Sequence, residues 1–380
     1  YILENGMRVA VKRSELIEYF KYIIVAIRKD RWVANLFYRL ADKNTRNGIQ
    51  IFEDFCKSGH MKEKDILAMR VLGDDAQIPA YRFENVLLRK NRRFYNGDES
   101  NFVNLFASDY NDDFPDPFVR ADILNWLYQV QALSGPTGDK GLFQVSELAR
   151  SLQVYGHSLA VIYRELAYLA RKNLVLCENS AMPIEEGDLV KITIPGALHL
   201  QMLRNVSYLS ACAEDTLFKN TEVMTRISNR LKFHESDSKL VVALNARDLV
   251  NYLIEYRKEY LTNSDELVSK KAIISSVDLN DSLHAVEQWI QADENLKKTI
   301  SEIDYFTVDM DVDACVVSKN SGGVVCTIAD KDVKGFISSL EPKYSFPRDV
   351  YSKIKPGDIL KCKVMEFDFT HRSFQLKYLN

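Results

Sequence analysis

Residues 321–338 read SGGVVCTIADKDVKGFIS, and this stretch decides the fold of the C-terminal part of the chain. Two runs rich in Val, Ile and Phe, at 324–328 and 333–338, are separated by polar residues, a pattern typical of neighbouring strands. The glycine pair at 322–323 suits a hairpin turn that requires positive φ. Further β-type runs, which bring the short strands to five, lie at 312–319, 359–364 and 372–377.

Four short motifs make this region resemble the ribosomal S-one type RNA-binding domain. They are Gly322-Gly323, Lys334-Gly335-Phe336-Ile337, Gly357-Asp358 and Arg372-Ser373-Phe374. The resemblance implies a C-terminal five-stranded OB-fold β-barrel over residues 308–380, with single-stranded RNA or DNA as its partner.

Strand alternation predicts which side chains of this barrel face outward. Along 359–364, it places Lys361 and Lys363 on the side opposite the apolar residues. The residues expected to bind nucleic acid are Lys319, Lys334, Phe336, Lys361, Lys363, Arg372 and Lys377. Many S-one type domains carry an aromatic residue on the second strand, where this chain has Val324-Val325. Nucleic-acid binding and protein docking therefore both stay open for the barrel.

The composition of the whole chain is that of a folded protein, with 46% hydrophobic and 27% charged residues in a length of 380. The net charge of −3 means that any nucleic-acid binding must come from a local basic patch. The six cysteines are scattered without a CxxC pair, which favours free thiols in the cytoplasm over a disulfide framework or structural zinc. No apolar run reaches the length of a membrane helix, so we expect no membrane partner.

Residues 117–195 have the pattern of a winged helix-turn-helix. The predicted helices and strands follow one another at 119–133, 145–152, 159–172, 174–176 and 188–194. Gly156 suits the sharp turn before the third helix, and Ser158 suits its N-cap.

In DNA-binding winged helices, the third helix enters the major groove. Here it would present His157, Ser158 and Arg164 to the nucleic acid. The wing, however, contains acidic residues that would repel phosphates: Glu178, Glu185, Glu186 and Asp188. The sequence leaves two interpretations open, direct DNA contact and a structural or protein-contact role.

The N-terminal block carries a further resemblance. Its Asn44-x-Arg46 pattern and the later segments 102–106 and 195–199 resemble the lid and winged-helix region of bacterial AAA+ and STAND-type P-loop ATPases. The resemblance implies that this is the C-terminal half of such a protein, with a role in signalling or anti-phage defence. It also implies that Arg46 can contact nucleotide phosphates.

The ATPase core itself is not found in this sequence. A P-loop requires GxxxxGK[ST], and the segment 135–141 has the wrong spacing, so we interpret it as a turn. We therefore expect no cofactor in this chain, with ATP bound only if a P-loop domain lies upstream. No catalytic motif and no metal-ligand spacing of histidines occurs, so no catalytic or metal residue is predicted and enzyme activity is left undecided.

The predicted domains are a helical lid-like domain, a connector, a winged helix, a helical connector domain and the OB-fold, at 1–75, 76–116, 117–195, 196–305 and 308–380. The leading hypothesis is a nucleic-acid-binding and sensing region of a P-loop ATPase that acts through the barrel and the winged helix. The rival hypothesis is an interaction scaffold, in which both modules dock a protein partner or form a homo-oligomer.

Overall fold

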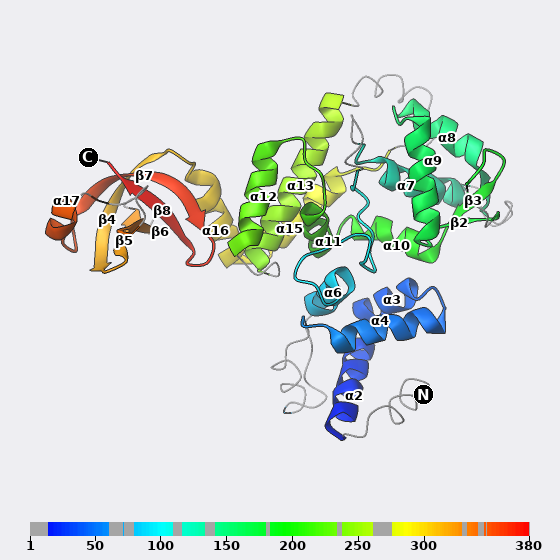
Figure 1. Ribbon diagram of the computed structural model, residues 1–380, viewed down its shortest axis with the longest axis horizontal. Coiled ribbons are helices and arrows are strands. Elements are labelled where there is room, and N and C mark those ends of the chain that lie inside the picture. The colour runs from blue at the N-terminus through cyan, green and yellow to red at the C-terminus, as the bar shows by residue number, and fades with distance from the viewer. Residues whose placement is uncertain are drawn as a thin grey trace. The chain divides into compact units, whose positions relative to one another are not determined.

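The computed structural model describes residues 14–60, 71, 80–108, 116–133, 141–179, 183–233, 238–260, 276–328, 333–340, 346 and 348–379. The chain divides into two compact units, residues 1–228 with 241–288, and residues 229–240 with 289–380. Helices dominate the described part of the larger unit, and a closed barrel lies in the smaller one (Figure 1). The predicted fold class is confirmed: mainly α, with a winged helix-turn-helix and a C-terminal five-stranded OB-fold barrel. No described helix has the length and apolarity needed to cross a membrane.

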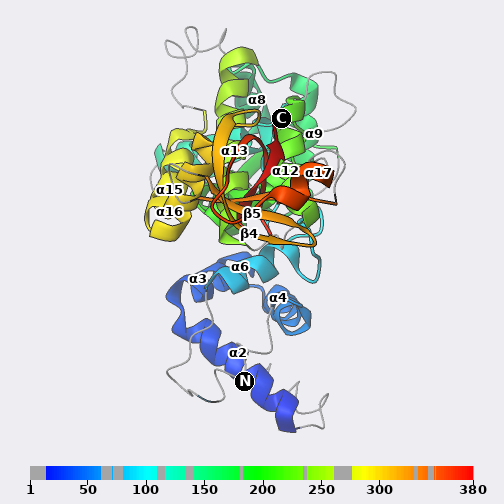
Figure 2. The same ribbon diagram turned by 90° about the vertical axis from the view of Figure 1, so that its left-hand side faces the viewer.

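Three amphipathic helices begin the described chain: α2 (Ser14–Lys29), α3 (Arg31–Leu40) and α4 (Thr45–Lys57). Figure 2 shows α3 and α4 close to α6 (Ala80–Arg89), and α4 packs against both α3 and α6. Asn44 caps α4 by accepting a hydrogen bond of 2.9 Å from the Arg46 backbone N–H. The Asn-x-Arg pattern thus does begin a helix, and the Arg46 side chain is exposed in its first turn.

Helix α6 lies within residues 76–116, which the sequence analysis assigned to a connector. Residues 82–89 are all buried, including the charged ones. Arg89 forms an ion pair with Glu214 in which each side chain is only 1% exposed. Glu84 accepts hydrogen bonds of 2.9 Å from Trp32 Nε1 and from Asn205 Nδ2. The distant partners that satisfy these charged groups cannot be recognised in a single sequence.

The winged helix has the predicted order of three helices and two wing strands, and the structure adds a short strand, β1, before the second helix. It consists of α7 (Val119–Leu133), β1 (Phe143–Gln144), α8 (Val145–Val154), α9 (Leu159–Arg171), β2 (Val175–Cys177) and β3 (Leu189–Ile192). The three strands form an antiparallel sheet in the order β1-β3-β2. Gly156 has a φ of 93°, and Ser158 Oγ accepts a hydrogen bond of 3.3 Å from Val161 N, so both residues act as predicted.

Two helices follow the wing, α10 (Ile194–Met202) and α11 (Val206–Glu214), and both form hydrogen bonds with the connector segment 95–106. The backbone N–H of Val103 donates to His199 Nε2 at 2.9 Å, and Tyr208 Oη donates to the Val103 carbonyl at 2.8 Å. Burial lowers the pKa of His199 to about 4, which keeps the ring neutral and able to accept this hydrogen bond. The connector is therefore part of the core.

The other helices described before the barrel are α12 (Thr221–Phe233), α13 (Lys239–Tyr260), α15 (Asn280–Gln291) and α16 (Glu294–Tyr305). The barrel follows, with β4 (Asp311–Asn320), β5 (Gly323–Ile328), β6 (Val333–Ser338), α17 (Arg348–Lys353), β7 (Ile359–Asp368) and β8 (Ser373–Tyr378). Its strands close in the order β4-β5-β6-β8-β7, and only β6 and β8 run parallel. The predicted alternation holds, because Leu360, Cys362 and Val364 are buried in the barrel core.

The glycine at the start of β5 has a specific steric role. Gly323 has a φ of 156°, and a Cβ atom there would collide with the backbone carbonyl oxygen of Ile337 on β6. The same atom would lie 2.7 Å from Cζ of Phe336. Only glycine lets β5 approach β6 this closely.

We expect Gly323→Ala to destabilise the protein by about 2 kcal/mol or more, because backbone atoms must move to make room. Urea unfolding followed by circular dichroism measures this. Gly322→Ala is the matched control, since a Cβ atom there would have only Asn320 Oδ1 within 4 Å, at 3.3 Å, and no backbone atom. Equal stability of the two variants would contradict the steric argument.

Candidate nucleic-acid interface

The outer surface of β5, β6 and β8 carries an aromatic residue at its centre. Phe336 of β6 pairs with Val325 of β5 on one side and with Gln375 of β8 on the other. All three side chains are partly exposed. The second strand, β5, lacks an aromatic residue, but the third strand, β6, provides Phe336 directly beside Val325. We call Val325, Phe336 and Gln375, which pair across the three strands, a row.

Basic residues lie on both sides of this row. Gly335 pairs with Phe374, so Lys334 is level with Ser373 and close in register to Arg372. On the other side, Lys377 of β8 pairs with Lys363 of β7. Lys334, Arg372 and Lys377 are exposed. We call the set Val325, Lys334, Phe336, Arg372, Gln375 and Lys377 the Phe336 face.

The hairpin that carries Arg372 is held by Asp368. Its Oδ1 accepts hydrogen bonds from the backbone N–H groups of Thr370 at 2.8 Å and His371 at 3.1 Å. Arg372 itself has a φ of 50°, which places it at the sharp end of the β7–β8 turn. The position of this cation is therefore set by a hydrogen-bonded turn.

Lys361 and Lys363 are outward, as predicted, but each faces an acidic residue of β4. Lys361 pairs with Asp313, and Lys363 pairs with Asp311. Lys363 Nζ lies 4.0 Å from Asp311 Oδ1. This edge of the barrel is close to charge balance. Alternation gives the side of the strand on which a residue lies but does not identify the neighbouring strand, so the two aspartates cannot be predicted as neighbours from the sequence.

Lys319, which the sequence analysis lists among the residues expected to bind nucleic acid, contacts the end of α17, and its part in binding stays a prediction. Its Nζ donates to the carbonyl of Tyr351 and lies 3.4 Å from the carbonyl of Ser352, at the end of α17. It also lies 4.5 Å from the centre of the Tyr351 ring. Helix C-termini leave carbonyl groups without partners and attract cations. Lys319 therefore acts as a cap for α17.

The outward placement of His157 is wrong. The side chain is buried, with Nδ1 bonded to Asp116 and Nε2 at 3.0 Å from Asp122 Oδ2. Burial alone lowers the pKa of His157, but the hydrogen bonds to the two carboxylates outweigh it and raise the pKa to about 10. Asp122 also accepts from Val277 N at 2.8 Å. The charged His157 thus connects the turn before α9 to Asp122 of α7. Asp122 in turn binds the backbone of Val277.

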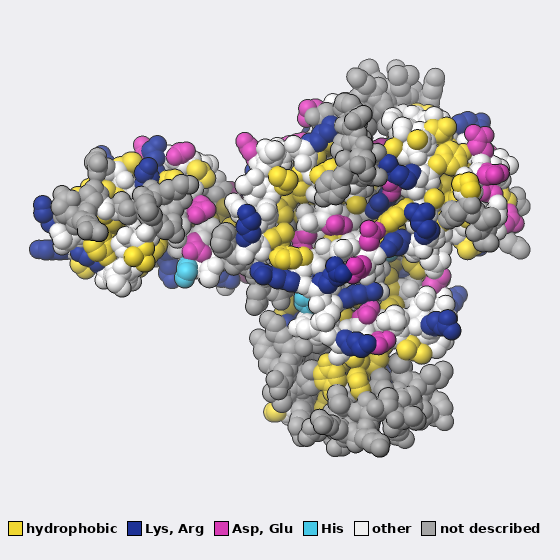
Figure 3. Space-filling view, viewed as in Figure 1, with side chains coloured by type: hydrophobic (Ala, Val, Ile, Leu, Met, Phe, Trp, Pro, Cys, Tyr) yellow, Lys and Arg dark blue, Asp and Glu magenta, His cyan; other side chains and the backbone are white. Residues whose placement is uncertain are grey.

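The remaining surface of the winged helix carries charges of both signs, with Arg150 and Arg171 exposed as well as the acidic wing. Arg164 Nε donates to Glu165 Oε1 at 2.8 Å, while Ser158 is exposed but is occupied in capping α9. Leu159, at the start of α9, is 41% exposed. The wing residues Glu178, Glu185 and Glu186 are exposed. Figure 3 shows Lys and Arg intermixed with Asp and Glu on the visible face of the larger unit, of which the winged helix is part.

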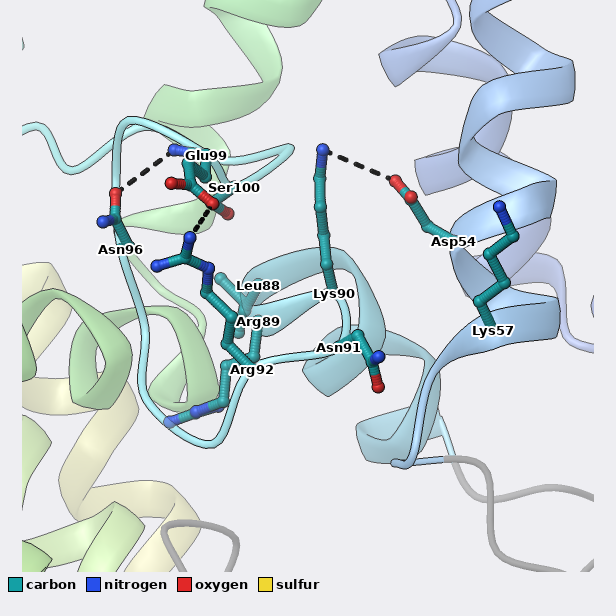
Figure 4. Close-up of a pocket in the computed structure, with 10 residues that line it drawn as sticks. All are labelled: Asp54, Lys57, Leu88, Arg89, Lys90, Asn91, Arg92, Asn96, Glu99 and Ser100. Atoms are coloured by element: carbon teal, nitrogen blue, oxygen red, sulfur yellow. Dashed lines mark hydrogen bonds and ion pairs between the residues drawn. The ribbon is translucent and has the colours of Figure 1, made fainter.

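A hollow of about 400 Å³ between α4 and the end of α6 is lined by several cations (Figure 4). The Lys90 ammonium points toward Asp54 and lies 3.6 Å from its Oδ2, and Arg92 forms an ion pair with Glu99. These charges are already compensated. Arg46, which the lid resemblance assigns to nucleotide phosphates, does not line this hollow.

No family model matches this chain, and no curated protein matches it. Among solved structures, it is similar to RNase R of Mycoplasma genitalium in the apo form, with a TM-score of 0.18 and 12% identity. A second structure of that RNase R, in complex with ribose methylated single-stranded RNA, gives a TM-score of 0.19 and 13% identity. The matches cover 69% of this chain and 40% of the other, so this chain spans less than half the length of those proteins. At TM-scores this low, no conclusion about the fold or the function of this chain follows from the similarity.

We expect Lys319→Met to lower the free energy of unfolding by about 1 kcal/mol, because the carbonyls at the end of α17 lose their cation. Lys334→Met, which removes the same charge from an exposed position of β6, should change stability by less than about 0.5 kcal/mol. Urea unfolding of both variants decides this. An equal effect of the two substitutions would contradict the cap.

We expect His157→Gln to lower the free energy of unfolding by about 3 kcal/mol, because the carboxylates of Asp116 and Asp122 lose a buried cation. The folded pKa of His157 lies above the unfolded value of about 6.5. Its contribution is therefore complete below pH 6.5 and is lost as the pH rises toward 10. Unfolding free energies measured from pH 6 to 10 should fall in the natural protein more than in the variant.

His284→Gln is the control for this comparison, since that side chain is exposed. Parallel pH profiles of the natural protein and His157→Gln would show that His157 is not charged in the folded state.

Proposed function

We propose that this chain binds single-stranded nucleic acid on the Phe336 face of its barrel. The observation that carries the proposal is the row Val325–Phe336–Gln375, flanked by Lys334 and Arg372 on one side and by Lys377 on the other. OB-folds bind oligonucleotides on the face of their second and third strands and with the adjoining loops. In this barrel those strands are β5 and β6.

The chemistry of the face suits unpaired bases. An aromatic ring can stack one base at about 1–3 kcal/mol, and neighbouring cations can contact the phosphates on both sides of it. The tip of the Phe336 ring lies over Gly323 of β5, at a place that the side chain of any other residue would occupy.

The number of cations limits the expected affinity. Three or four phosphate contacts give a slope of log affinity against log salt of about −2 to −3 for a single strand. The net charge of −3 provides no further attraction at long range. We therefore expect binding that is moderate and easily weakened by salt.

The test is fluorescence anisotropy of the full chain with labelled single-stranded RNA, single-stranded DNA and duplex DNA at two salt concentrations. Phe336→Leu keeps an apolar side chain but removes the stacking surface, so we expect single-strand affinity to fall about tenfold. Lys334→Glu combined with Arg372→Glu should lower the affinity further and reduce the salt slope by about 1 or more.

The matched control is Lys361→Glu combined with Lys363→Glu, which makes the same charge change beside Asp313 and Asp311. We expect it to weaken binding less than the Lys334 and Arg372 pair does. A larger loss from the control would move the interface to β7 and β4. Tight binding of duplex DNA that none of these variants changes would reject the proposal.

A second candidate function is a protein-interaction scaffold that acts through the winged helix. The observation that favours it is the exposure of Leu159, Val154 and Leu176, at 41%, 38% and 43%, together with an acidic wing. Such a surface repels phosphates but fits a partner protein with apolar and basic residues. Single-strand binding that survives Leu159→Glu would leave this surface free for that role.

The wider hypothesis, that the chain is the C-terminal region of a P-loop ATPase in signalling or anti-phage defence, stays a prediction. In that setting Arg46 would contact the nucleotide. The deciding measurement is ATP binding by a longer protein with a P-loop domain before this chain, compared with Arg46→Ala. Unchanged binding in that variant would reject the role of Arg46.

A further inference from the structure

The turn between β7 and β8 brings a histidine beside the Phe336 face. His371 Nδ1 lies 2.8 Å from Asp368 Oδ2, and Gln375 Nε2 donates to the same oxygen at 3.4 Å. Gln375 pairs with Phe336, and Arg372 directly follows His371 in the chain. The imidazole therefore lies at the border of the Phe336 face, next to one of its cations.

The fold holds this turn in place from two directions. Asp368 Oδ1 accepts hydrogen bonds from two backbone N–H groups of the turn. The Phe369 ring packs edge to face on Phe367, with 5.1 Å between the ring centres, and the Arg230 guanidinium of α12 lies 5.9 Å from the centre of the Phe369 ring. A strand that reaches His371 would thus not need to order the turn that carries it.

The Asp368 carboxylate decides which nitrogen of the His371 ring carries a hydrogen. Partial burial raises the pKa of the Asp368 carboxyl, but hydrogen bonds from the His371 side chain and from the turn outweigh this effect and lower the pKa. Asp368 is therefore a carboxylate near neutral pH and can only accept hydrogen bonds, so Nδ1 of His371 must be a donor. Nε2 is then the nitrogen at which the ring gains or loses its proton.

Nε2 is open to a ligand. The His371 side chain is 76% exposed, and the described part of the chain provides no hydrogen-bond partner for Nε2. In the neutral ring this atom presents a lone pair, which repels a phosphate oxygen. In the charged ring it presents an N–H group, which can form a charge-assisted hydrogen bond to phosphate.

Charged groups of both signs lie on the elements around the ring. They are Asp368 and Glu366 of β7, Arg372 and Lys334 of the Phe336 face, and Arg230 of α12. Side chains of these types keep their charge between pH 6 and 8, whereas histidine is the type that changes charge in this range. A change in phosphate binding between these two pH values would therefore come from a histidine.

Two buried histidines keep a constant charge over the same range. Burial lowers the pKa of His157, but the hydrogen bonds to Asp116 and Asp122 outweigh it and raise the pKa to about 10. Burial lowers the pKa of His199 to about 4. His157 thus stays charged and His199 stays neutral, so neither can produce a change between pH 6 and 8.

We propose that His371, in its protonated form, is a further phosphate-binding residue of the Phe336 face. The inference rests on the proposed function and extends it, because it makes the affinity of the face for single strands depend on pH. A bound phosphate and a bound proton each stabilise the other, so binding of the strand and binding of the proton are coupled.

The test is fluorescence anisotropy of the full chain with labelled oligouridine, a strand whose own charge does not change between pH 6 and 8. We expect the affinity to rise about three- to tenfold from pH 8 to pH 6, the size of one hydrogen bond. The slope of log affinity against log salt should become steeper by about 0.7, because one more phosphate is contacted by a cation.

His371→Gln is the deciding variant, since its amide can still donate to Asp368 but cannot become charged. We expect it to bind at pH 6 as the natural protein binds at pH 8, with an unchanged melting temperature because the side chain is exposed. His284→Gln is the matched control, because that histidine is also exposed but lies in the larger unit. It should keep the full pH dependence.

Two outcomes would overturn the inference while the proposed function stands, provided that Phe336→Leu still weakens binding. They are equal affinities of the natural protein at pH 6 and pH 8, and a full pH dependence in His371→Gln. Absence of single-strand binding at both pH values would reject the proposed function and this inference with it.

Discussion

The larger unit depends on the buried ion pair between Arg89 and Glu214. Glu214 also accepts a hydrogen bond of 2.8 Å from the Tyr95 backbone N–H, so one carboxylate holds both α6 and the start of the connector. Burial raises the pKa of Glu214, and the charge of Arg89 opposes that rise. Neither charge can be lost alone, because the other would then be left in an apolar interior. The positions of α6, the connector and α11 are thereby fixed together.

A second group of polar contacts continues this core without charge. His199 and Tyr208 bond the backbone of Val103, and Asn104 Nδ2 donates to Thr216 Oγ1 at 3.2 Å. Backbone groups of a segment without regular structure can be buried only when such partners are present. The same logic applies at the turn before α9, where His157 and Asp122 join elements that are far apart in sequence. His157, which the sequence suggests as a nucleic-acid-binding residue, thus stabilises the fold.

Local patterns in the sequence predicted most of the secondary structure. The predicted bounds of α7 agree with the structure, and those of α9 differ by one residue, because Ser158, Gly156 and an apolar repeat mark the helix and its turn locally. What could not be predicted depends on distant partners. Lys319 looks like any outward lysine until α17 is placed beside it, and Asp311 becomes relevant to Lys363 only when β4 and β7 meet. The proposed interface likewise needed the parallel pairing of β6 with β8, which alternation within one strand does not contain.

That parallel pairing also has a consequence for biosynthesis. The outer edge of β6 is covered only by β8, the last strand of the barrel to leave the ribosome. Until then, β6 presents unpaired backbone groups next to a half-formed apolar core, and such an edge invites pairing with another chain. The exposed charge of Lys334 lies on this edge and discourages that pairing. A side chain assigned here to ligand binding would thus also protect the nascent protein from aggregation.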